Sequence, residues 1–310
     1  MTTPLRPVLL SAALAGTLVL SACTASPEDS DAQDGSQIDV AAAFYPLEFV
    51  AAGVAGEHAN VQGLTAPGVE PHDLELSPAT VREMQDASVV LYLSDFQPAV
   101  DDAIAATDVH TLDAAGAVEL KDTADHEAEA EDDHDDHDHG TIDPHFWLDP
   151  TLLATYATAV GEEFASLDPT NADDYTANAA ALAADLTELD ATFTEGLAQC
   201  ERQDIFVTHE AFGYLTGRYG LHQEGLSGID PDAEPSPARV REIRDLMGAE
   251  GATTVFTESL VSANVAEALA SDAGVATAVL DPIEGVVGQD DYMSVMNQNL
   301  SNLREALACS

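Results

Sequence analysis

The chain alternates short apolar runs with helical segments in two separate stretches, and this alternation restricts the folds open to it more than any other feature. The first stretch covers residues 38–150 and the second covers residues 200–310. Strands that alternate with helices favour parallel sheets covered on both faces. Residues 151–199 are helical throughout, and residues 172–198 place leucines along one face. The sequence therefore predicts an α/β protein of two α/β lobes, each with a mostly parallel sheet, joined by one long backbone helix.

Each predicted strand is a short apolar run that ends at a turn or a loop. The strands lie at residues 38–44, 61–64, 88–93 and 109–112 in the first lobe and at 205–208, 221–226, 253–257 and 275–280 in the second. Ser77-Pro78 marks a helix start, because serine caps the first turn and proline is tolerated in it. Ligands of open α/β sheets bind beyond the carboxyl ends of the strands, so we expect the loops there to face a shared cleft.

The N-terminus carries the features of an export signal. An apolar run at residues 8–20 is too short to span a bilayer, and Leu20-Ser21-Ala22-Cys23 follows it. This ending resembles the bacterial lipoprotein signal, whose cysteine is acylated and becomes the mature N-terminus; an ordinary signal peptide with an incidental cysteine is the alternative. We predict a signal peptide at 1–22, lipid attachment at Cys23 and a disordered tether at 23–37. The protein is then extracytoplasmic and lipid-anchored to the outer face of the cell membrane.

Two cysteines remain after Cys23. An even pair in an exported protein predicts one disulfide, here between Cys200 and Cys309, with two unpaired thiols as the alternative. The bridge would tie the C-terminal helix to the start of the second lobe. Because it closes a loop of over a hundred residues, it contributes up to about 4–5 kcal/mol on the chain-entropy model.

The chain is strongly acidic, with 57 acidic residues against 9 basic ones and a formal net charge of −48. Such a field repels nucleic acid and anionic lipid and attracts cations, although solubility alone also explains it. No glycine-rich stretch ends in Lys-Ser or Lys-Thr, so a nucleotide-binding loop is excluded and any energy that the function requires has to come from another chain. We expect a monomer that binds no nucleic acid.

Residues 121–140 interrupt the first lobe with ten acidic residues and four histidines and almost no apolar residue. Such a segment cannot bury a core, so we predict a disordered loop. Its histidines are His126, His134, His137 and His139. They are either solvated low-complexity residues or weak tethered ligands that gather Zn(II) beside the cleft.

Three histidines outside this loop fall in loops after predicted strands or at lobe junctions: His72, His145 and His209. Neutral imidazole is a preferred ligand of Zn(II), and three imidazoles leave one tetrahedral position. Asp281 fits this position because it ends an apolar strand on the same expected rim. Each histidine taken singly could instead be a capping or hydrogen-bonded loop residue. Together the four residues predict a metal site between the lobes.

The sequence resembles the metal-binding lipoproteins of bacterial zinc ABC importers, a group of solute-binding proteins for Zn(II), Mn(II) and Fe(II). The matching stretches are Ala42-Ala43-Phe44-Tyr45-Pro46-Leu47, Gly68 to Pro78, Asp143-Pro144-His145-Phe146-Trp147-Leu148-Asp149-Pro150, Thr208 to Leu215 and Gly228 to Pro237. The resemblance implies two lobes linked by a backbone helix, a Zn(II) site at His72, His145, His209 and Asp281, and delivery to an ABC permease with a cytoplasmic ATPase. The long linker helix suggests modest lobe movement, so we expect the ion to be released by small ligand shifts, of Asp281 or of the His209 loop, rather than by a wide hinge motion.

The residue at position 209 bears on metal preference. Manganese-type relatives are expected to carry a carboxylate there, and imidazole suits Zn(II) better than the harder Mn(II). A receptor for Mn(II) or Fe(II) from the same family is the alternative. Glu70 and Glu258 are candidates for orienting the ligating imidazoles from a position next to them.

A zinc hydrolase is the main competing function, because three histidines and a water also form catalytic sites. His209-Glu210 would need a histidine at position 213 to match the zincin pattern, and that residue is Gly213. A protein ligand in the fourth position would also remove the open coordination site. A cell-surface adhesin, a role attached to some relatives, has no sequence feature in its favour. We therefore predict a receptor that is not an enzyme.

Overall fold

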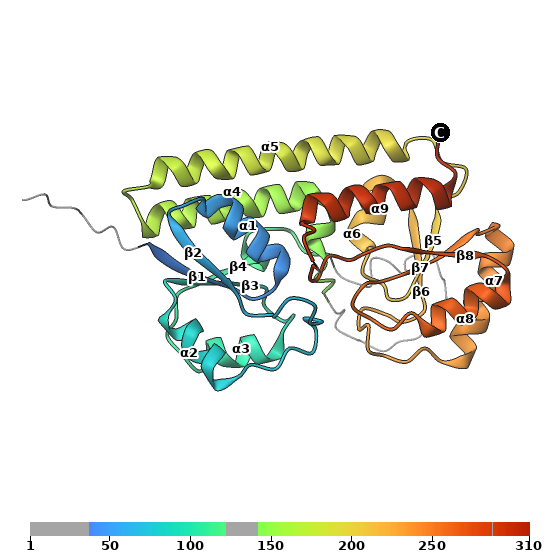
Figure 1. Cartoon of the computed structure of the whole chain (residues 1–310), viewed down its shortest axis with the longest axis horizontal. Helices are drawn as coiled ribbons and strands as arrows, with labels where there is room; N and C mark the ends of the chain where they lie inside the picture. The colour runs from blue at the N-terminus through green and yellow to red at the C-terminus, as the bar shows by residue number, and fades with distance from the viewer. Residues whose placement is uncertain (1–36, 122–141, 287) are drawn as a thin grey trace, which may run out of the picture. The chain divides into compact units, whose positions relative to one another are not determined.

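The structure is a computed structural model that describes residues 37–121, 142–286 and 288–310 (Figure 1). The predicted signal peptide, Cys23 and the four loop histidines His126, His134, His137 and His139 lie outside the described residues. Within the described ranges, parallel strands alternate with helices at both ends of the chain, and two long helices lie between the two sets. The predicted α/β class with parallel sheets is confirmed.

The first lobe contains a four-stranded parallel sheet with the strand order β2-β1-β3-β4. The strands are β1 (Ile38–Ala42), β2 (Ala59–Gly63), β3 (Val89–Tyr92) and β4 (Thr111–Asp113). Val40 of the central strand β1 pairs with Val61 on one side and with Val89 on the other. The helices of this lobe are α1 (Tyr45–Ala55), α2 (Pro78–Asp86) and α3 (Pro98–Ala105). The side chain of Ser77 caps α2, accepting hydrogen bonds from the backbone of Ala79 and Thr80.

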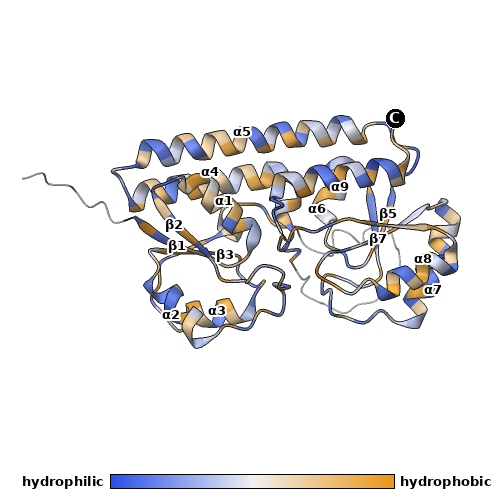
Figure 2. Cartoon of the chain, in the orientation of Figure 1, coloured by the Kyte–Doolittle hydropathy of each residue, from blue (hydrophilic) through white to orange (hydrophobic). Residues whose placement is uncertain are grey.

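The middle of the chain forms two antiparallel helices, α4 (Pro150–Leu167) and α5 (Ala172–Leu197). The 26 residues of α5 correspond to a length of about 39 Å. Helix α5 packs against α1 and α4 at the first lobe and against α6 and α9 at the second (Figure 1). Apolar and polar residues alternate along it in Figure 2, as its one-sided packing requires. It is therefore the backbone helix that the sequence predicts.

The second lobe contains two short parallel ladders, β5-β6 and β7-β8, with β5 and β7 next to each other. The strands are β5 (Asp204–Val207), β6 (His222–Gly225), β7 (Thr254–Thr257) and β8 (Ala276–Val279). The helices are α6 (Gly213–Tyr219), α7 (Pro237–Glu250), α8 (Asn264–Ala273) and α9 (Tyr292–Leu307). Phe206 and Val255 of these strands form a small core with Ile243 and Leu269 of α7 and α8. A larger core extends from the first sheet through α4, α5 and α9.

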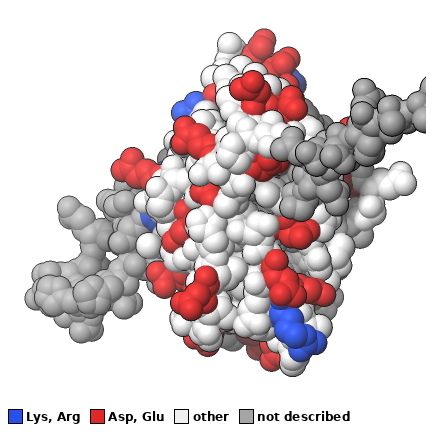
Figure 3. Space-filling view, turned by 90° about the vertical axis from the view of Figure 1, so that its left-hand side faces the viewer, with Lys and Arg blue, Asp and Glu red and all other residues white. Residues whose placement is uncertain are grey.

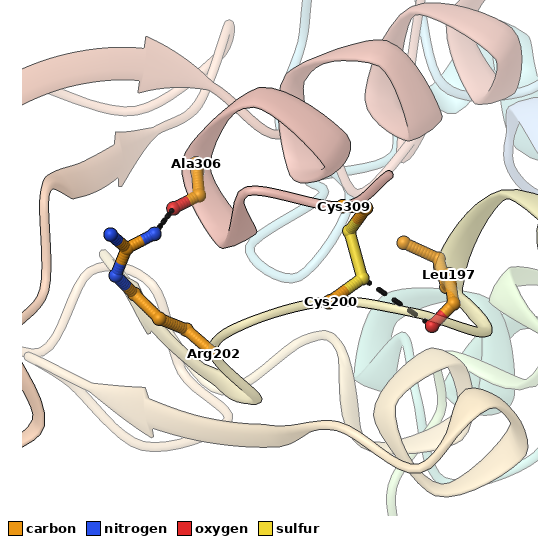
Figure 4. Close-up of a disulfide and its surroundings, with 5 residues drawn as sticks. All are labelled: Leu197, Cys200, Arg202, Ala306 and Cys309. Atoms are coloured by element: carbon orange, nitrogen blue, oxygen red, sulfur yellow. Dashed lines mark hydrogen bonds between the residues drawn. A yellow bond between two sulfur atoms is a disulfide. The ribbon is translucent and has the colours of Figure 1, made fainter.

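Cys200 and Cys309 form a disulfide that joins the end of α5 to the residues after α9 (Figure 4). The predicted bridge is confirmed. Arg202 supports the same junction, because its guanidinium donates to the carbonyl oxygens of Gly251 and Ala306 at 3.0 and 3.2 Å. The C-terminal helix is thus attached to the start of the second lobe at two points.

The surface is rich in carboxylates, and the face drawn in Figure 3 carries acidic residues over its whole height with few basic ones. In the described part of the chain, no helix combines the length and the apolar character that crossing a bilayer requires.

Candidate metal centre

Four side chains from four separate loops meet in the interior of the molecule: His72, His145, His209 and Glu284. One ligand atom from each lies within 4.8 Å of the other three. His72 follows β2, and His209 and Glu284 follow β5 and β8. His145 directly precedes the short 3-10 helix η3 (Phe146–Leu148). The carboxyl ends of parallel strands face one edge of their sheet, which explains why these loops converge.

The carboxylate of Glu284 lies at the centre of the group. Its Oε1 is 2.9 Å from Nε2 of His72, 3.0 Å from Nε2 of His145 and 3.7 Å from Nε2 of His209. A tetrahedral zinc ion with bonds near 2.0–2.1 Å separates its ligand atoms by roughly 3.4 Å, which lies inside this range. Nε2 of His209 and Oε2 of Glu284 are buried and make no hydrogen bond to any described residue. The donor atoms therefore fit a tetrahedral cation.

His145 is oriented by its own segment of the chain. Oδ1 of Asp143 accepts hydrogen bonds from the backbone N–H of His145 at 2.9 Å and from its Nδ1 at 2.8 Å. This leaves Nε2 directed at Glu284. The hydroxyl of Tyr214 in α6 donates to the carbonyl oxygen of Asp143 and accepts from the backbone N–H of Lys121. A residue of the second lobe thus holds both described ends of the acidic loop beside the site.

His209 is oriented by Glu258, which comes directly after β7. Oε2 of Glu258 lies 2.8 Å from Nδ1 of His209, and Oε1 accepts from the backbone N–H of His209 at 3.2 Å. The hydroxyl of Thr208 donates to the same Oε1. Glu258 thus fixes both the backbone and the ring of this histidine.

Glu70 lies beside the third histidine and holds its backbone. Its Oε2 accepts from the backbone N–H of His72 at 3.0 Å. Burial, and then the neighbouring charge of Glu284, raise the pKa of Glu70 to about 7. This carboxyl group therefore belongs to the charge balance of the site although it is absent from the four-residue group.

Asp281, which the sequence suggested as the fourth ligand, is not a member of the group. Its Oδ1 accepts from the backbone N–H of Ile283 at 2.8 Å, and its backbone N–H and C=O bond to Asn299. Glu284, three residues later in the same loop, points at the histidines instead. Both carboxylates follow β8, and the sequence reasoning chose Asp281 because it lies closer to the end of the strand. The side chain of Asp281 thus bonds within its own loop, to Ile283.

His145, His209 and Glu284 hold one another in their charged forms in the absence of an ion. Burial lowers the pKa of His209, but its contacts with Glu258 and Glu284 outweigh burial and raise the pKa to about 10. Burial likewise opposes the charge on His145, while Asp143 and Glu284 raise its pKa above the ordinary value. The three histidines hold the pKa of Glu284 well below its usual range despite its burial. His145, His209 and Glu284 therefore carry charge before an ion binds, and a cation can replace the protons on these two histidines.

The chain matches a family model and several known proteins. The family model described as "Zinc-uptake complex component A periplasmic" matches residues 40–306. The zinc-binding lipoprotein AdcA of Streptococcus pneumoniae is 32% identical over 303 residues, which is 93% of this chain and 58% of that protein. The high-affinity zinc uptake system protein ZnuA of Bacillus subtilis is 29% identical over 300 residues, 94% of each chain. This chain thus spans little more than half the length of the first of these relatives.

A solved structure extends the likeness to the fold. The Zn(II)-bound ZnuA-like domain of Streptococcus pneumoniae AdcA is 30% identical and superposes with a TM-score of 0.74, covering 87% of this chain and 99% of that domain. The two-lobe arrangement is therefore shared with a structure of known metal content. From its matched family model, its relatives and this superposition, the chain belongs to the family of zinc-uptake complex component A proteins.

Proposed function

We propose that this protein captures Zn(II) outside the cytoplasm and delivers it to an ABC permease driven by a cytoplasmic ATPase. The observation that carries the proposal is the meeting of His72, His145, His209 and Glu284 in one buried group. His72 and His145 come from the first lobe and the other two from the second. An ion bound by all four would join the lobes, and a permease could distinguish the joined form from the ion-free form.

The ligand set supports Zn(II) over Mn(II). Three imidazoles and one carboxylate suit a borderline ion, whereas Mn(II) prefers more oxygen ligands. The group offers His209 at the position where a carboxylate would favour Mn(II). The two relatives, AdcA and ZnuA, are both named for zinc. Transport of Mn(II) or Fe(II) is the alternative within the same family.

A carrier function also suits the coordination better than catalysis does. Catalytic zinc sites have three protein ligands and keep a fourth position for water or substrate. Here Glu284 supplies a fourth ligand from the protein, and the group is almost fully buried. His72 is its most accessible member, with a side chain that is 12% exposed. The ion therefore enters past His72, and we expect no hydrolytic activity.

The remaining features fit a receptor held at the membrane. Lipid attachment at Cys23 would keep the protein beside its permease, and the acidic surface would attract cations. The loop histidines His126, His134, His137 and His139 would act as weak collecting ligands before the ion reaches the buried group. A monomer suffices, because one chain supplies all four ligands.

Calorimetric titration of the chelator-treated protein with Zn(II) tests the proposal. We expect one tight site per chain and loss of that site in His145→Ala. Competition with Mn(II) in the same titration should leave Zn(II) bound. Tight binding that persists in a variant lacking all three imidazoles, or preferential binding of Mn(II), would contradict the assignment.

A further inference from the structure

The loop that carries Glu284 contains an unusual backbone conformation. Ile283 is completely buried and has a φ of 59°. This left-handed region is unfavourable for residues with a Cβ atom and most of all for β-branched ones. Strain of this kind persists only where the surrounding structure enforces it, and it is concentrated at functional sites. The residue that directly follows Ile283 is Glu284, a member of the candidate metal centre.

Three contacts hold the segment Asp281–Glu284, which we call the Glu284 arm. Asn299 of α9 accepts from the backbone N–H of Asp281 at 2.9 Å and donates to its carbonyl oxygen at 2.7 Å. Nε1 of Trp147 donates to the carbonyl oxygen of Pro282 at 2.7 Å. The third contact is internal, from the N–H of Ile283 to the carboxylate of Asp281.

The two external contacts come from different parts of the site. Asn299 is buried and belongs to the second lobe. Trp147 belongs to the same short helix that follows His145, and its ring centroid lies 5.2 Å from that of His145. The arm is thus fastened both to its own lobe and to the segment that holds a ligand of the other lobe.

We propose that the Glu284 arm is a strained holder of the fourth ligand, and that Asn299 and Trp147 are positioning residues that set how fast the bound ion leaves. This inference rests on the proposed Zn(II) function. Relaxation of Ile283 to a negative φ would change the direction of the next side chain and withdraw the Glu284 carboxylate. The ion would then keep only three imidazoles. The contacts of Asn299 and Trp147 oppose that relaxation, so weakening either one accelerates release.

Two asparagines of α9 provide a matched test. Asn299 donates to the carbonyl oxygen of Asp281, and Asn302 donates to that of Val279, both at 2.7 Å. Only Asn299 touches the arm. Zinc dissociation from the purified protein into excess chromophoric chelator should be about ten- to a hundredfold faster in Asn299→Ala, the range for groups that orient metal ligands. Asn302→Ala should release zinc at the parental rate.

Two further measurements separate positioning from general destabilisation. In a Glu284→Ala background, adding Asn299→Ala should not accelerate release further, because Asn299 acts through Glu284. The visible spectrum of the Co(II)-loaded Asn299→Ala variant should shift toward that of Glu284→Ala, while the Asn302→Ala spectrum stays parental. Additive rates or an unshifted spectrum would overturn the positioning role.

The strain itself is tested at Ile283 with two variants that both lose the buried side chain. Ile283→Ala keeps a Cβ atom and Ile283→Gly does not. If strain drives withdrawal of the arm, zinc should dissociate from the Gly variant at least roughly five times more slowly than from the Ala variant. The reason is that a left-handed φ is unfavourable for alanine but not for glycine. Equal rates, or faster release from the Gly variant, would overturn the proposal.

These outcomes differ from a failure of the proposed function. If the parent protein does not bind one zinc ion per chain, the proposed Zn(II) function falls. If the parent binds one zinc ion per chain and either Asn299→Ala or the Ile283 pair releases it without the predicted difference, the arm proposal falls and the Zn(II) function stands.

Discussion

The two sides of the metal centre are assembled in different ways. On the first-lobe side, His145 takes its orienting carboxylate from Asp143, two residues earlier in the same turn. On the second-lobe side, His209 depends on Glu258, 49 residues later in the chain, and Glu284 depends on Asn299 and Trp147. The first side is a local motif, whereas the second exists only when several strands and a helix are in place.

This difference has a physical consequence for the ion-free protein. The orientation of the His145 ring should survive a slight movement of the lobes, because the carboxylate that orients it lies two residues away. Long-range contacts require the packing of β5, β7 and α9 to be maintained, and they fail together when it loosens. We therefore expect the second-lobe ligands to be the adjustable half of the site and His145 to be its fixed point.

The largest expected effect is the loss of a ligand from either side. Four-ligand zinc sites are worth about 10–16 kcal/mol, so one ligand is worth roughly 2.5–4 kcal/mol, or about a hundred- to a thousandfold in affinity. We expect His145→Ala and Glu284→Ala each to weaken Zn(II) binding by about this factor in a chelator competition assay. Equal losses would show that both sides contribute to the bound state.

Asp281→Asn is the control for this prediction. The amide oxygen of asparagine can still accept from the backbone N–H of Ile283, so the arm keeps its internal contact. We expect a loss of at most about threefold, within the range of one neutral hydrogen bond. A larger loss from Asp281→Asn than from Glu284→Ala would return the ligand role to Asp281.

The same difference explains what the sequence could predict. Alternating apolar runs were sufficient for the α/β class and for α5, because periodicity depends on local residue order. His145 could be found because its motif is local, with Asp143, Pro144 and Trp147 around it. Glu284 was missed because nothing within its own segment separates it from Asp281. The choice between them is made by Asn299 and by the φ of Ile283, which depend on tertiary packing.

The orienting carboxylates give the next largest effect. Oδ1 of Asp143 accepts from both the backbone N–H and the Nδ1 of His145, and the amide oxygen of asparagine can replace it. Glu258 uses both of its oxygens, so glutamine has to give up one contact. Loss of such a partner lowers metal affinity roughly ten- to a hundredfold. We expect Asp143→Asn to weaken zinc binding by about tenfold and Glu258→Gln by about a hundredfold. Titrations giving the reverse order would contradict the division into local and long-range sides.

A smaller and graded effect is expected from pH. The pKa of His209 is raised from 6.5 to about 10 in the folded, ion-free protein. The contacts of protonated His209 therefore stabilise the folded, ion-free protein fully below pH 6.5. This contribution is lost as the pH rises toward 10. Zn(II) has to displace the proton, so its affinity should rise with pH by up to about tenfold per unit for each proton displaced.

Thermal unfolding at several pH values checks this prediction. The ion-free protein should become less stable between pH 6.5 and 9, while the increase in Tm caused by Zn(II) should grow over the same interval. His209→Gln should flatten the part of this dependence that belongs to the second-lobe side. A zinc-induced increase in Tm that does not change with pH would mean that the cluster is not protonated when it is free of metal.

The smallest effect on the site is expected from the disulfide, although its effect on stability is large. Cys309 follows α9, the helix that carries Asn299, but the bridge lies at the far end of that helix. Replacing both cysteines by serine should lower the free energy of unfolding by up to about 4–5 kcal/mol, measured in denaturant. Zinc affinity should change by less than about threefold, because the packing of α9 near Asn299 is held by its own buried face. A tenfold faster release of zinc in this variant would extend the long-range side of the site from Asn299 to the C-terminus.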